Sequence, residues 1–361
     1  MQANSAKARQ TKSVHIVVVG LGNIGRRFLS ILDRKAHHLL RHYGLTFRLV
    51  GAADSRGAAF DPEGLNIATV VDLKQEKRTV AEYPARGRPG MTSLELLQHV
   101  QADALCEATP VNLEHGEPGL SCMQTAMNLE MHVVTANKGP LVLAYHELMA
   151  LAREKGVQLR FCGTVAGGLP AINLGQRDLA GATIYRLEAL PNLTTSFILD
   201  KIAHGMTYDQ ALAAAQAQGC AEADPSLDVE GWDAASKLVI LANSVLNVPA
   251  TLKDVQVQGI TDVTLADLEQ AKAKGQVIKL VASAVQQDEG YALTVAPTSL
   301  PADHPLAQLS GQQMGIVYYT DIFGTISAAI LEEEPIPSAA TMLRDLLSIV
   351  QDVPIRYGQN R

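Results

Sequence analysis

The stretch Val14-His15-Ile16-Val17-Val18-Val19-Gly20-Leu21-Gly22-Asn23-Ile24-Gly25 decides the fold of this chain. The mostly β-branched run predicts a strand, the glycines predict a tight turn, and the apolar residues of 26–40 recur at helical spacing. Glycines spaced G-x-G-x-x-G between a strand and a helix are typical of a dinucleotide site, because a pyrophosphate can approach the helix N-terminus. The alternative is a turn that serves only packing. We expect a phosphate turn made by Gly20, Leu21, Gly22, Asn23, Ile24 and Gly25.

Further strands alternate with helices along the first part of the chain. Apolar runs at 47–53, 102–108 and 132–135 predict strands, and the stretches 94–99 and 118–128 between them predict helices. Such alternation predicts a parallel sheet with right-handed crossovers, which is an α/β fold of the Rossmann type. The segment 57–89 is rich in glycine, proline and charge, and we expect it to be an irregular excursion.

A second domain is expected because 361 residues exceed the size of one ordinary core. Its predicted elements are a strand and a glycine-rich turn within 157–174, a strand at 183–190, and helices at 207–217 and about 231–246. We expect a Rossmann domain at 12–150, completed by a C-terminal helical segment at 336–361 whose amphipathic part is 338–350. An α+β catalytic and dimerisation domain is expected at 151–335.

Composition excludes several classes of protein. Hydrophobic residues make up 47% and charged residues 19%, and the net charge of -7 is spread without a basic block, so nucleic acid is not an expected partner. The polar residues 1–12 lack the apolar core of a signal peptide, and no apolar run is long enough to span a membrane. The four cysteines show no zinc spacing. We expect a cytoplasmic protein with reduced thiols.

Two positions bear on the cofactor. Asp54 closes the second predicted strand and could accept a hydrogen bond from the adenosine 2′-hydroxyl of NAD, whereas Arg56 could meet the extra phosphate of NADP. The residues leave this choice open. Thr109-Pro110 follows the third strand and would lie at the carboxyl edge of the sheet, where such folds bind ligands, although Thr-Pro can also simply end a strand.

Polar groups of unusual kinds gather at 135–138, 162–170 and 219–237. Lys237 follows Asp233 by four residues, so both share one helix face. By itself this could be an exposed ion pair, and Lys138 could be a solvated residue at a helix start.

Taken together, these segments resemble the homoserine dehydrogenase family over nearly the whole chain. The resemblance is carried by the glycine turn, Thr109-Pro110, Thr135-Ala136-Asn137-Lys138-Gly139-Pro140 and 163–170. It is most specific in Ala221-Glu222-Ala223-Asp224-Pro225 and in Asp228-Val229-Glu230-Gly231-Trp232-Asp233-Ala234-Ala235-Ser236-Lys237-Leu238.

The resemblance implies hydride exchange between homoserine and NAD or NADP, giving aspartate 4-semialdehyde, in the biosynthesis of threonine and methionine. It implies Lys237 and Lys138 as catalytic lysines, with Asp233 orienting Lys237. Carboxylates suit the ammonium group of the substrate, and Glu222 and Asp228 match family residues that hold it, with Thr194 in the substrate loop. The implied cofactor residues are the glycine turn, Asp54, Arg56, Thr109, Pro110, Thr135 and Lys138.

The resemblance also implies a monovalent cation, often sodium, held by backbone carbonyls of Val165, Gly167 and Leu169; oxygen ligands suit such a hard cation. A turn that needs only the conformational freedom of its glycines is the alternative. A homodimer built through strands of the second domain is implied as well. Because the sequence ends at Arg361, we expect no regulatory ACT domain.

Four positions depart from the family pattern. Leu193 stands where the substrate loop usually has glycine, Cys220 replaces a tyrosine, Cys162 replaces an acid, and 330–335 replaces a glycine-rich segment. These departures keep two alternatives open. One is an oxidoreductase acting on a different small hydroxy acid or amino alcohol, and the other is a cofactor-binding regulatory protein without turnover.

Overall fold

The computed structural model describes residues 11–218, 221, 224–332 and 336–351. Two compact units form: the first comprises the chain up to Pro140, His146–Phe161 and the chain from Ser338, and the second comprises Leu141–Tyr145 and Cys162–Pro337. The first unit thus extends past the expected boundary at residue 150. The reason is that Leu159 and Arg160 form a strand that pairs in the sheet of the first unit.

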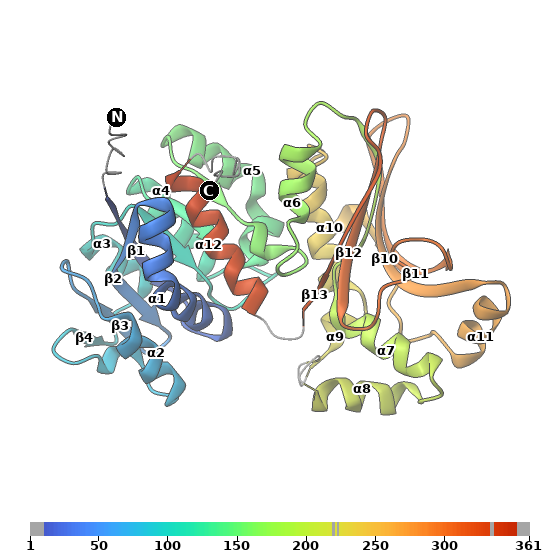
Figure 1. The fold of residues 1–361 in the computed structure, drawn as a ribbon, viewed down its shortest axis with the longest axis horizontal. Helices are drawn as coiled ribbons and strands as arrows, with labels where there is room; N and C mark the ends of the chain where they lie inside the picture. The colour runs from blue at the N-terminus through green and yellow to red at the C-terminus, as the bar shows by residue number, and fades with distance from the viewer. Residues whose placement is uncertain (1–10, 219–220, 222–223, 333–335, 352–361) are drawn as a thin grey trace, which may run out of the picture. The chain divides into compact units, whose positions relative to one another are not determined.

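The first unit is built on a seven-stranded sheet, drawn in blue to green in Figure 1. Its strand order is β4-β3-β2-β1-β5-β6-β7, and β1 pairs in parallel with β2 and β5. The strands are β1 (Lys12–Val19), β2 (Leu45–Asp54), β3 (Gly57–Phe60), β4 (Gly87–Pro89), β5 (Ala104–Glu107), β6 (His132–Thr135) and β7 (Leu159–Arg160). The expected α/β fold is confirmed, since β2, β1, β5, β6 and β7 are parallel as predicted.

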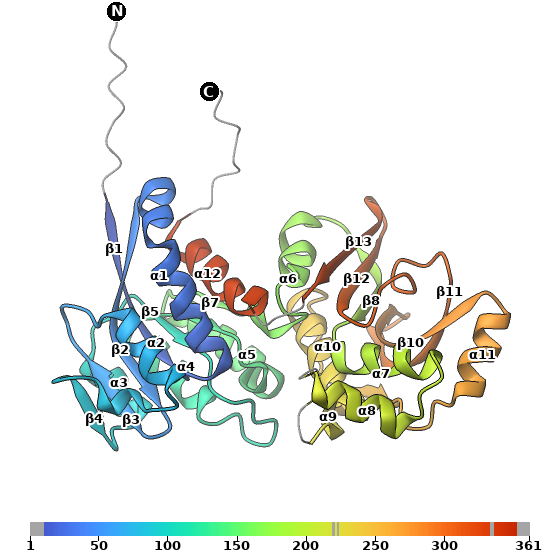
Figure 2. The ribbon, with the colours of Figure 1, turned by 60° about the horizontal axis from the view of Figure 1, so that its bottom comes forward.

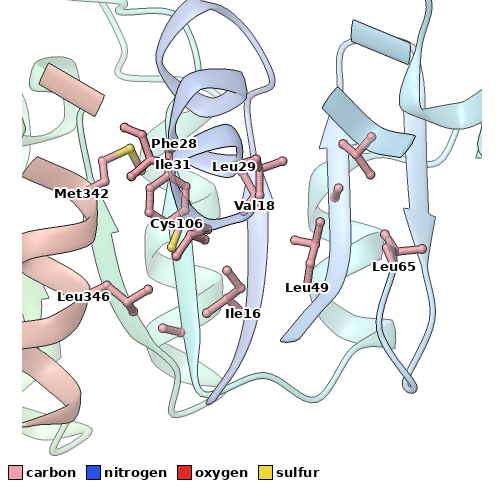
Figure 3. Close-up of a cluster of buried hydrophobic side chains, with 14 of the residues drawn as sticks. Ile16, Val18, Phe28, Leu29, Ile31, Leu49, Leu65, Cys106, Met342 and Leu346 are labelled. Atoms are coloured by element: carbon pink, nitrogen blue, oxygen red, sulfur yellow. The ribbon is translucent and has the colours of Figure 1, made fainter. Parts of the chain in front are cut away.

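Helices cover both faces of this sheet. On one face, Ile16 and Val18 of β1 share a buried cluster with Phe28 of α1 and Met342 and Leu346 of α12, as Figure 3 shows. On the other face, Leu96 and Val17 both lie against Gly51. The helices are α1 (Asn23–Tyr43), α2 (Ile67–Gln75), α3 (Ser93–His99), α4 (Gly119–Asn128), α5 (Lys138–Glu154) and α12 (Ile336–Val350), with the 3-10 helix η1 (Val80–Glu82).

The expectation of an irregular excursion at 57–89 is wrong. This segment holds β3, α2, η1 and β4, and β3 pairs antiparallel with both β2 and β4. Two of its glycines lie where backbone packs on backbone: a Cβ would lie 2.5 Å from the Arg88 carbonyl oxygen at Gly57 and 1.9 Å from the Ala81 carbonyl oxygen at Gly87. Short strands with such glycines lack the alternating pattern by which strands are recognised.

The second unit is built on a six-stranded sheet of order β13-β12-β8-β10-β11-β9. Its pairs are antiparallel except for β9 with β11. The long β-ribbons appear in orange and red in Figure 1 and from a second side in Figure 2. The strands are β8 (Ile184–Leu190), β9 (Val255–Val257), β10 (Gln276–Gln286), β11 (Tyr291–Pro301), β12 (Gln313–Thr320) and β13 (Gly324–Leu331).

The central helix of the second unit is α10 (Trp232–Ser244), which is buried along most of its length and contacts β10 and β11. The other helices are α6 (Ala171–Asn173), α7 (Leu193–Ala203), α8 (Tyr208–Ala217), α9 (Ser226–Val229) and α11 (Leu265–Ala273), with η2 (Cys162–Thr164), η3 (Leu174–Asp178) and η4 (Leu252–Asp254). Among the described residues, no helix is both long enough and apolar enough to cross a membrane.

Candidate active site

Each glycine of the phosphate turn has a distinct physical role. Gly20 has φ +90°, and a Cβ there would lie 2.3 Å from the carbonyl of Ala108, so only glycine fits between β1 and the end of β5. A Cβ at Gly25 would lie 1.9 Å from the Gly20 carbonyl oxygen. Around Gly22, by contrast, no described atom lies within 4 Å of a built Cβ. Gly20 and Gly25 therefore serve packing, and Gly22 leaves space for a ligand.

Helix α1 begins directly at this open glycine. Gly22 is its N-cap, no side chain caps it, and its first turn contains no acidic residue. The first N–H groups of a helix need acceptors, and the helix dipole favours an anion there. Within the described part of the chain, the turn thus presents the features that bind a phosphate group.

A buried glutamate joins the carboxyl ends of β5 and β6. Glu107 is fully buried and accepts hydrogen bonds from the backbone N–H of Thr109 at 2.7 Å, from the Thr109 hydroxyl, and from the Thr135 hydroxyl at 2.6 Å. Burial raises the pKa of Glu107, whereas the bonds from Thr109, Thr135 and Asn137 oppose that shift. Glu107 could not be identified from the sequence, because a single acidic residue at the end of an apolar strand gives no sign of a partner 28 residues away.

Asn137 connects this network to the first residue of α5. Its backbone N–H donates to the Thr135 hydroxyl at 2.9 Å, and its side chain donates to the Thr109 hydroxyl at 3.1 Å and to the Pro110 carbonyl at 3.3 Å. Its side-chain oxygen accepts from the N–H of Gly139, so Asn137 caps α5, whose first residue is Lys138. The structure therefore brings Thr109, Pro110, Thr135 and Lys138 to one edge of the first sheet.

Asp54 is engaged inside the protein. Its Oδ1 accepts from the backbone N–H of Arg56 and the hydroxyl of Thr79, and its Oδ2 accepts from Lys74 at 2.6 Å and from the N–H of Val80 at 3.0 Å. Burial raises the pKa of Asp54, but the bonds from Lys74, Arg56, Thr79 and Val80 outweigh it and the pKa lies below its ordinary value. Four donors fill the lone-pair positions of a carboxylate. The guanidinium group of the exposed Arg56 donates to the carbonyl of Lys77 at 3.2 Å.

In the second unit, α10 carries the predicted lysine and its partner. Lys237 Nζ lies 2.7 Å from Asp233 Oδ2 and donates to the carbonyl of Pro191 at 2.6 Å. The side chains are 16% and 8% exposed, so this pair is largely removed from water. The prediction that both residues share one helix face is confirmed, and the alternative of an exposed ion pair is wrong.

Asn192 binds both aspartates of this region. Its side-chain nitrogen donates to Asp228 Oδ1 at 2.7 Å and to Asp233 Oδ2 at 2.6 Å, and its oxygen accepts from Thr195 N–H as the cap of α7. Thr194 donates to Asp228 Oδ2 at 2.9 Å. The structure thus brings together Asp228, Asp233, Lys237 and Thr194. Asn192 could not be singled out from the sequence, because nothing local pairs it with residues 36 and 41 positions later.

Two of the departing positions take ordinary places in the second unit. Leu193 is the first residue of α7, half-buried, in a helix that needs no glycine there. Cys162 is buried and donates to the side-chain oxygen of Asn173 at 3.3 Å. Glu222 and Cys220 lie outside the described residues.

The glycine-rich turn predicted to hold a cation has an unusual backbone. Ala166 and Gly167 have φ of +53° and +56°, so two successive residues are left-handed. Gly168 N–H donates to Oε2 of Glu332, a buried carboxylate. Val165 and Leu169 are buried beside it. Backbone carbonyl and carboxylate oxygens are the kinds of ligand that suit a hard monovalent cation, and Cys162 stands where the family pattern has an acid.

Comparison with known proteins gives these groups a context. The model of the family "Homoserine dehydrogenase" matches residues 170–347, and that of its NAD-binding domain matches residues 20–162. A homoserine dehydrogenase of Methanocaldococcus jannaschii is 38% identical over 335 residues, which cover 92% of this chain and 98% of the relative. The chain belongs to the homoserine dehydrogenase family. It is therefore an enzyme of the NAD(P)-dependent oxidoreductases that act on CH–OH groups.

Two further relatives concern the cofactor. An NAD(+)-dependent homoserine dehydrogenase of Pseudomonas canavaninivorans is 33% identical, covering 93% of this chain and 96% of the relative. A solved structure of a hyperthermophilic archaeal homoserine dehydrogenase mutant in complex with NADPH has a TM-score of 0.82 and 25% identity, covering 95% of this chain and 99% of that one. Both support a nicotinamide cofactor, and they differ in which one they name.

Proposed function

We propose that this protein interconverts L-homoserine and L-aspartate 4-semialdehyde by hydride exchange with a nicotinamide dinucleotide. The observation that carries the proposal is the geometry of Lys237. An ammonium group has three N–H bonds, and the described residues take two of them, at Asp233 Oδ2 and the Pro191 carbonyl. The third is left for an oxygen of the substrate.

Lys237 would move the proton of the reacting oxygen. In the oxidation, the substrate hydroxyl gives its proton to the neutral amine of Lys237 as the adjacent carbon gives up hydride; in the reduction, the ammonium returns that proton to the aldehyde oxygen. When bound, the nicotinamide supplies the hydride acceptor or donor. Asp233 and the Pro191 carbonyl hold the nitrogen in one place, which matters because misplacement by an ångström is costly in rate. Lys138 would add positive charge near the developing alkoxide.

The substrate ammonium group would bind at Asp228. Its carboxylate accepts one bond from Asn192 and one from Thr194, so about half of its acceptor capacity remains for a ligand. Glu222 is proposed as the second carboxylate on the strength of the family motif. The hydrogen bond from Thr194 to Asp228 supports a site in which Thr194 positions Asp228 and lies close to the substrate.

For the cofactor we propose a preference for NADP(H). The support is Asp54, whose carboxylate is filled by four internal donors and cannot readily accept from a ribose 2′-hydroxyl. Arg56 and Lys74 lie beside it and bring positive charge to the end of β2. We expect Arg56→Ala to raise KM for NADP by about 10- to 100-fold, the cost of one charge-assisted bond, and to change KM for NAD little. Equal effects on both cofactors would contradict this preference.

A monovalent cation is proposed at the carbonyls of Val165, Gly167 and Leu169, where it would rigidify the turn. Replacing sodium salts by tetramethylammonium salts should lower the melting temperature and the turnover number together. If neither changes, the turn needs no cation and its glycines serve only the backbone.

Turnover itself is tested with purified protein, NAD or NADP, and a panel of homoserine and other small hydroxy acids and amino alcohols, following the absorbance of the reduced cofactor. We expect homoserine to be the best substrate. Lys237→Ala should lower kcat by at least about 100-fold, as loss of an acid–base group does, with cofactor affinity nearly unchanged. The exposed Lys253, changed to Met, is the matched control and should keep wild-type rates.

The outcomes separate the alternatives. Turnover of another alcohol but not of homoserine would show a family member with a changed substrate, as Leu193 and Cys220 suggest. Cofactor binding without turnover of any substrate would favour a regulatory protein. A normal rate for Lys237→Ala would remove this lysine from the mechanism.

A further inference from the structure

Glu107 is a buried acid that the proposed chemistry does not use. It is 0% exposed, and so is Thr135, while Asn137 is 1% exposed. A carboxylate is rarely buried so completely unless its surroundings satisfy it, because removal from water is costly. Every partner of Glu107 belongs to the edge of the sheet where the cofactor residues lie, which calls for an explanation beyond ordinary packing.

The hydrogen bonds around Glu107 run in one direction. The Thr135 hydroxyl donates to one carboxylate oxygen and accepts from the backbone N–H of Asn137. The Thr109 hydroxyl donates to the other oxygen and accepts from the side chain of Asn137. A hydroxyl has only one hydrogen, so each donates inward because the carboxylate accepts there. The acceptor at the centre therefore fixes which way both hydroxyls point.

Two segments of the edge are held by this arrangement. One arm begins at Thr109, directly beside the phosphate turn, since a Cβ at Gly20 would lie 2.5 Å from the Thr109 nitrogen. The other arm passes through Thr135 to Asn137, the cap residue that precedes Lys138. Gly119 closes the site, because a Cβ there would lie 2.6 Å from the Asn137 side-chain nitrogen. The network is too tightly enclosed to rearrange freely.

We propose that Glu107 is a positioning residue of the dehydrogenase reaction, which holds Thr109–Pro110 and Asn137–Lys138 in one arrangement through its two carboxylate oxygens. It touches neither substrate nor cofactor, and it acts through the two threonine hydroxyls and Asn137. The inference rests on the proposed function for the role of Lys138. It adds a residue whose two carboxyl oxygens order both strand ends together.

The test compares Glu107→Gln with wild type. The amide keeps the shape of the side chain, but its N–H group would face a hydroxyl that already donates a hydrogen bond. Either the Thr109 or the Thr135 hydroxyl must therefore reorient. We expect kcat with homoserine to fall at least about 10-fold, KM for homoserine to change less than about threefold, and cofactor Kd to rise by a few fold, as misplacement of a reacting group predicts. Amide hydrogen exchange at Asn137 and Gly139 should become at least about 10-fold faster, with the rest of the first sheet unchanged.

Two comparisons keep a simple loss of stability from explaining the result. Glu188 is a carboxylate of the second unit, 2% exposed and bonded to Arg186, His304 and Tyr319, so Glu188→Gln removes a buried charge elsewhere and should keep wild-type kcat in the folded fraction. Thr135→Val removes the hydrogen bond from the Thr135 hydroxyl to Glu107 and should reproduce part of the decrease in kcat. The double variant Glu107→Gln with Thr135→Val should have the same kcat as Glu107→Gln alone, because both changes act through one hydrogen-bond network.

Wild-type kcat and wild-type exchange at Asn137 in Glu107→Gln would overturn the proposal, as would additive losses in the double variant. If the wild-type protein does not oxidise homoserine at all, the proposed function fails. The exchange rates and the cofactor affinity would still decide whether Glu107 orders this edge.

Discussion

Lys237 shows how much of the candidate site depends on single side chains of the second unit. Its nitrogen is held by one carboxylate and one backbone carbonyl, and Asn192 holds that carboxylate from the other side. These hydrogen bonds mainly fix the position of the Lys237 nitrogen. Replacing one of the partner side chains should therefore lower the reaction rate more than the stability of the fold.

Asp233→Asn tests this at the residue scale. The amide keeps the size of the side chain but places a neutral group beside the largely buried ammonium, so Lys237 should lose its fixed position. We expect kcat to fall by about 10- to 100-fold with KM for the cofactor unchanged, measured by steady-state kinetics. The exposed pair Arg78 and Glu82 has the same i,i+4 spacing, and Glu82→Gln should leave both rate and melting temperature unchanged. Equal kinetics in the two variants would show that Asp233 does not orient the lysine.

Asp54 gives a prediction about acid stability. Its pKa is lower in the fold than in the unfolded chain, so the ionised carboxyl stabilises the protein. That contribution is fully present above the ordinary value of 3.8 and is lost as the pH falls through the lowered pKa. Asp54→Asn should therefore be less stable than wild type at pH 7, and the difference should shrink below about pH 4.

Urea titrations from pH 7 to pH 3 measure this difference, with the exposed Asp288→Asn as the control. A gap between wild type and Asp54→Asn that stays constant over the whole range would contradict the proposed linkage.

The residues of the site could be predicted only where their partners are close in sequence. Asp233 and Lys237 are four residues apart on one helix, so their pairing is visible in the sequence. Asn192 and Glu107 were not singled out, because their partners come from distant elements and are defined only by the fold. Asp54 lies at the expected strand end, but its four internal donors could not be seen, since three of them come from residues 20 to 26 positions later.

At the scale of elements, the strand, turn and helix of β1 and α1 were predictable because three glycines mark their junction. The segment 57–89 was not predictable in this way, because Gly57 and Gly87 mark close packing between short strands rather than irregular chain. Glycine therefore has two roles in this molecule: it leaves space for a ligand, or it allows two backbone segments to pack closely. The phosphate turn contains glycines of both kinds.

The variants Gly22→Ala and Gly25→Ala distinguish the two roles of glycine in this turn. At Gly25 the added methyl group meets the Gly20 carbonyl oxygen, so the fold should lose about 1–3 kcal/mol, as overpacked sites do. At Gly22 the methyl group meets no described atom and the backbone is extended, with φ -75°, so stability should stay near wild type. Cofactor Kd should nevertheless rise about tenfold in Gly22→Ala, because the methyl group occupies the approach to the first N–H groups of α1.

Thermal melts of the free proteins and titration of cofactor fluorescence give the two quantities. The distinction fails if Gly22→Ala is the less stable variant or if it binds cofactor as tightly as wild type.

At the scale of the whole molecule, the second sheet ends at an edge strand, β13, that could pair with a strand of another chain. β13 is an edge strand whose residues alternate between half-buried and exposed, and Thr325, Ser327, Ala329 and Leu331 are the exposed set. Apolar side chains accompany it, since Ile322, Phe323 and Leu331 are 64%, 47% and 53% exposed. Long exposed edges with apolar neighbours are rarely left to solvent in native proteins.

We therefore expect a homodimer in which β13 and its exposed side chains meet a second copy of the chain. Sedimentation should give twice the 38.6 kDa of one chain for the wild-type protein. The double variant Ser327→Arg and Ala329→Arg places four like charges across the symmetric contact and should sediment as a monomer, because a closed dimer repeats each change on both sides. Gln287→Arg, in the exposed turn after β10, adds charge away from this strand and should remain dimeric. A monomeric wild-type protein would contradict the dimer. A double variant that remains dimeric would show that the interface does not include β13.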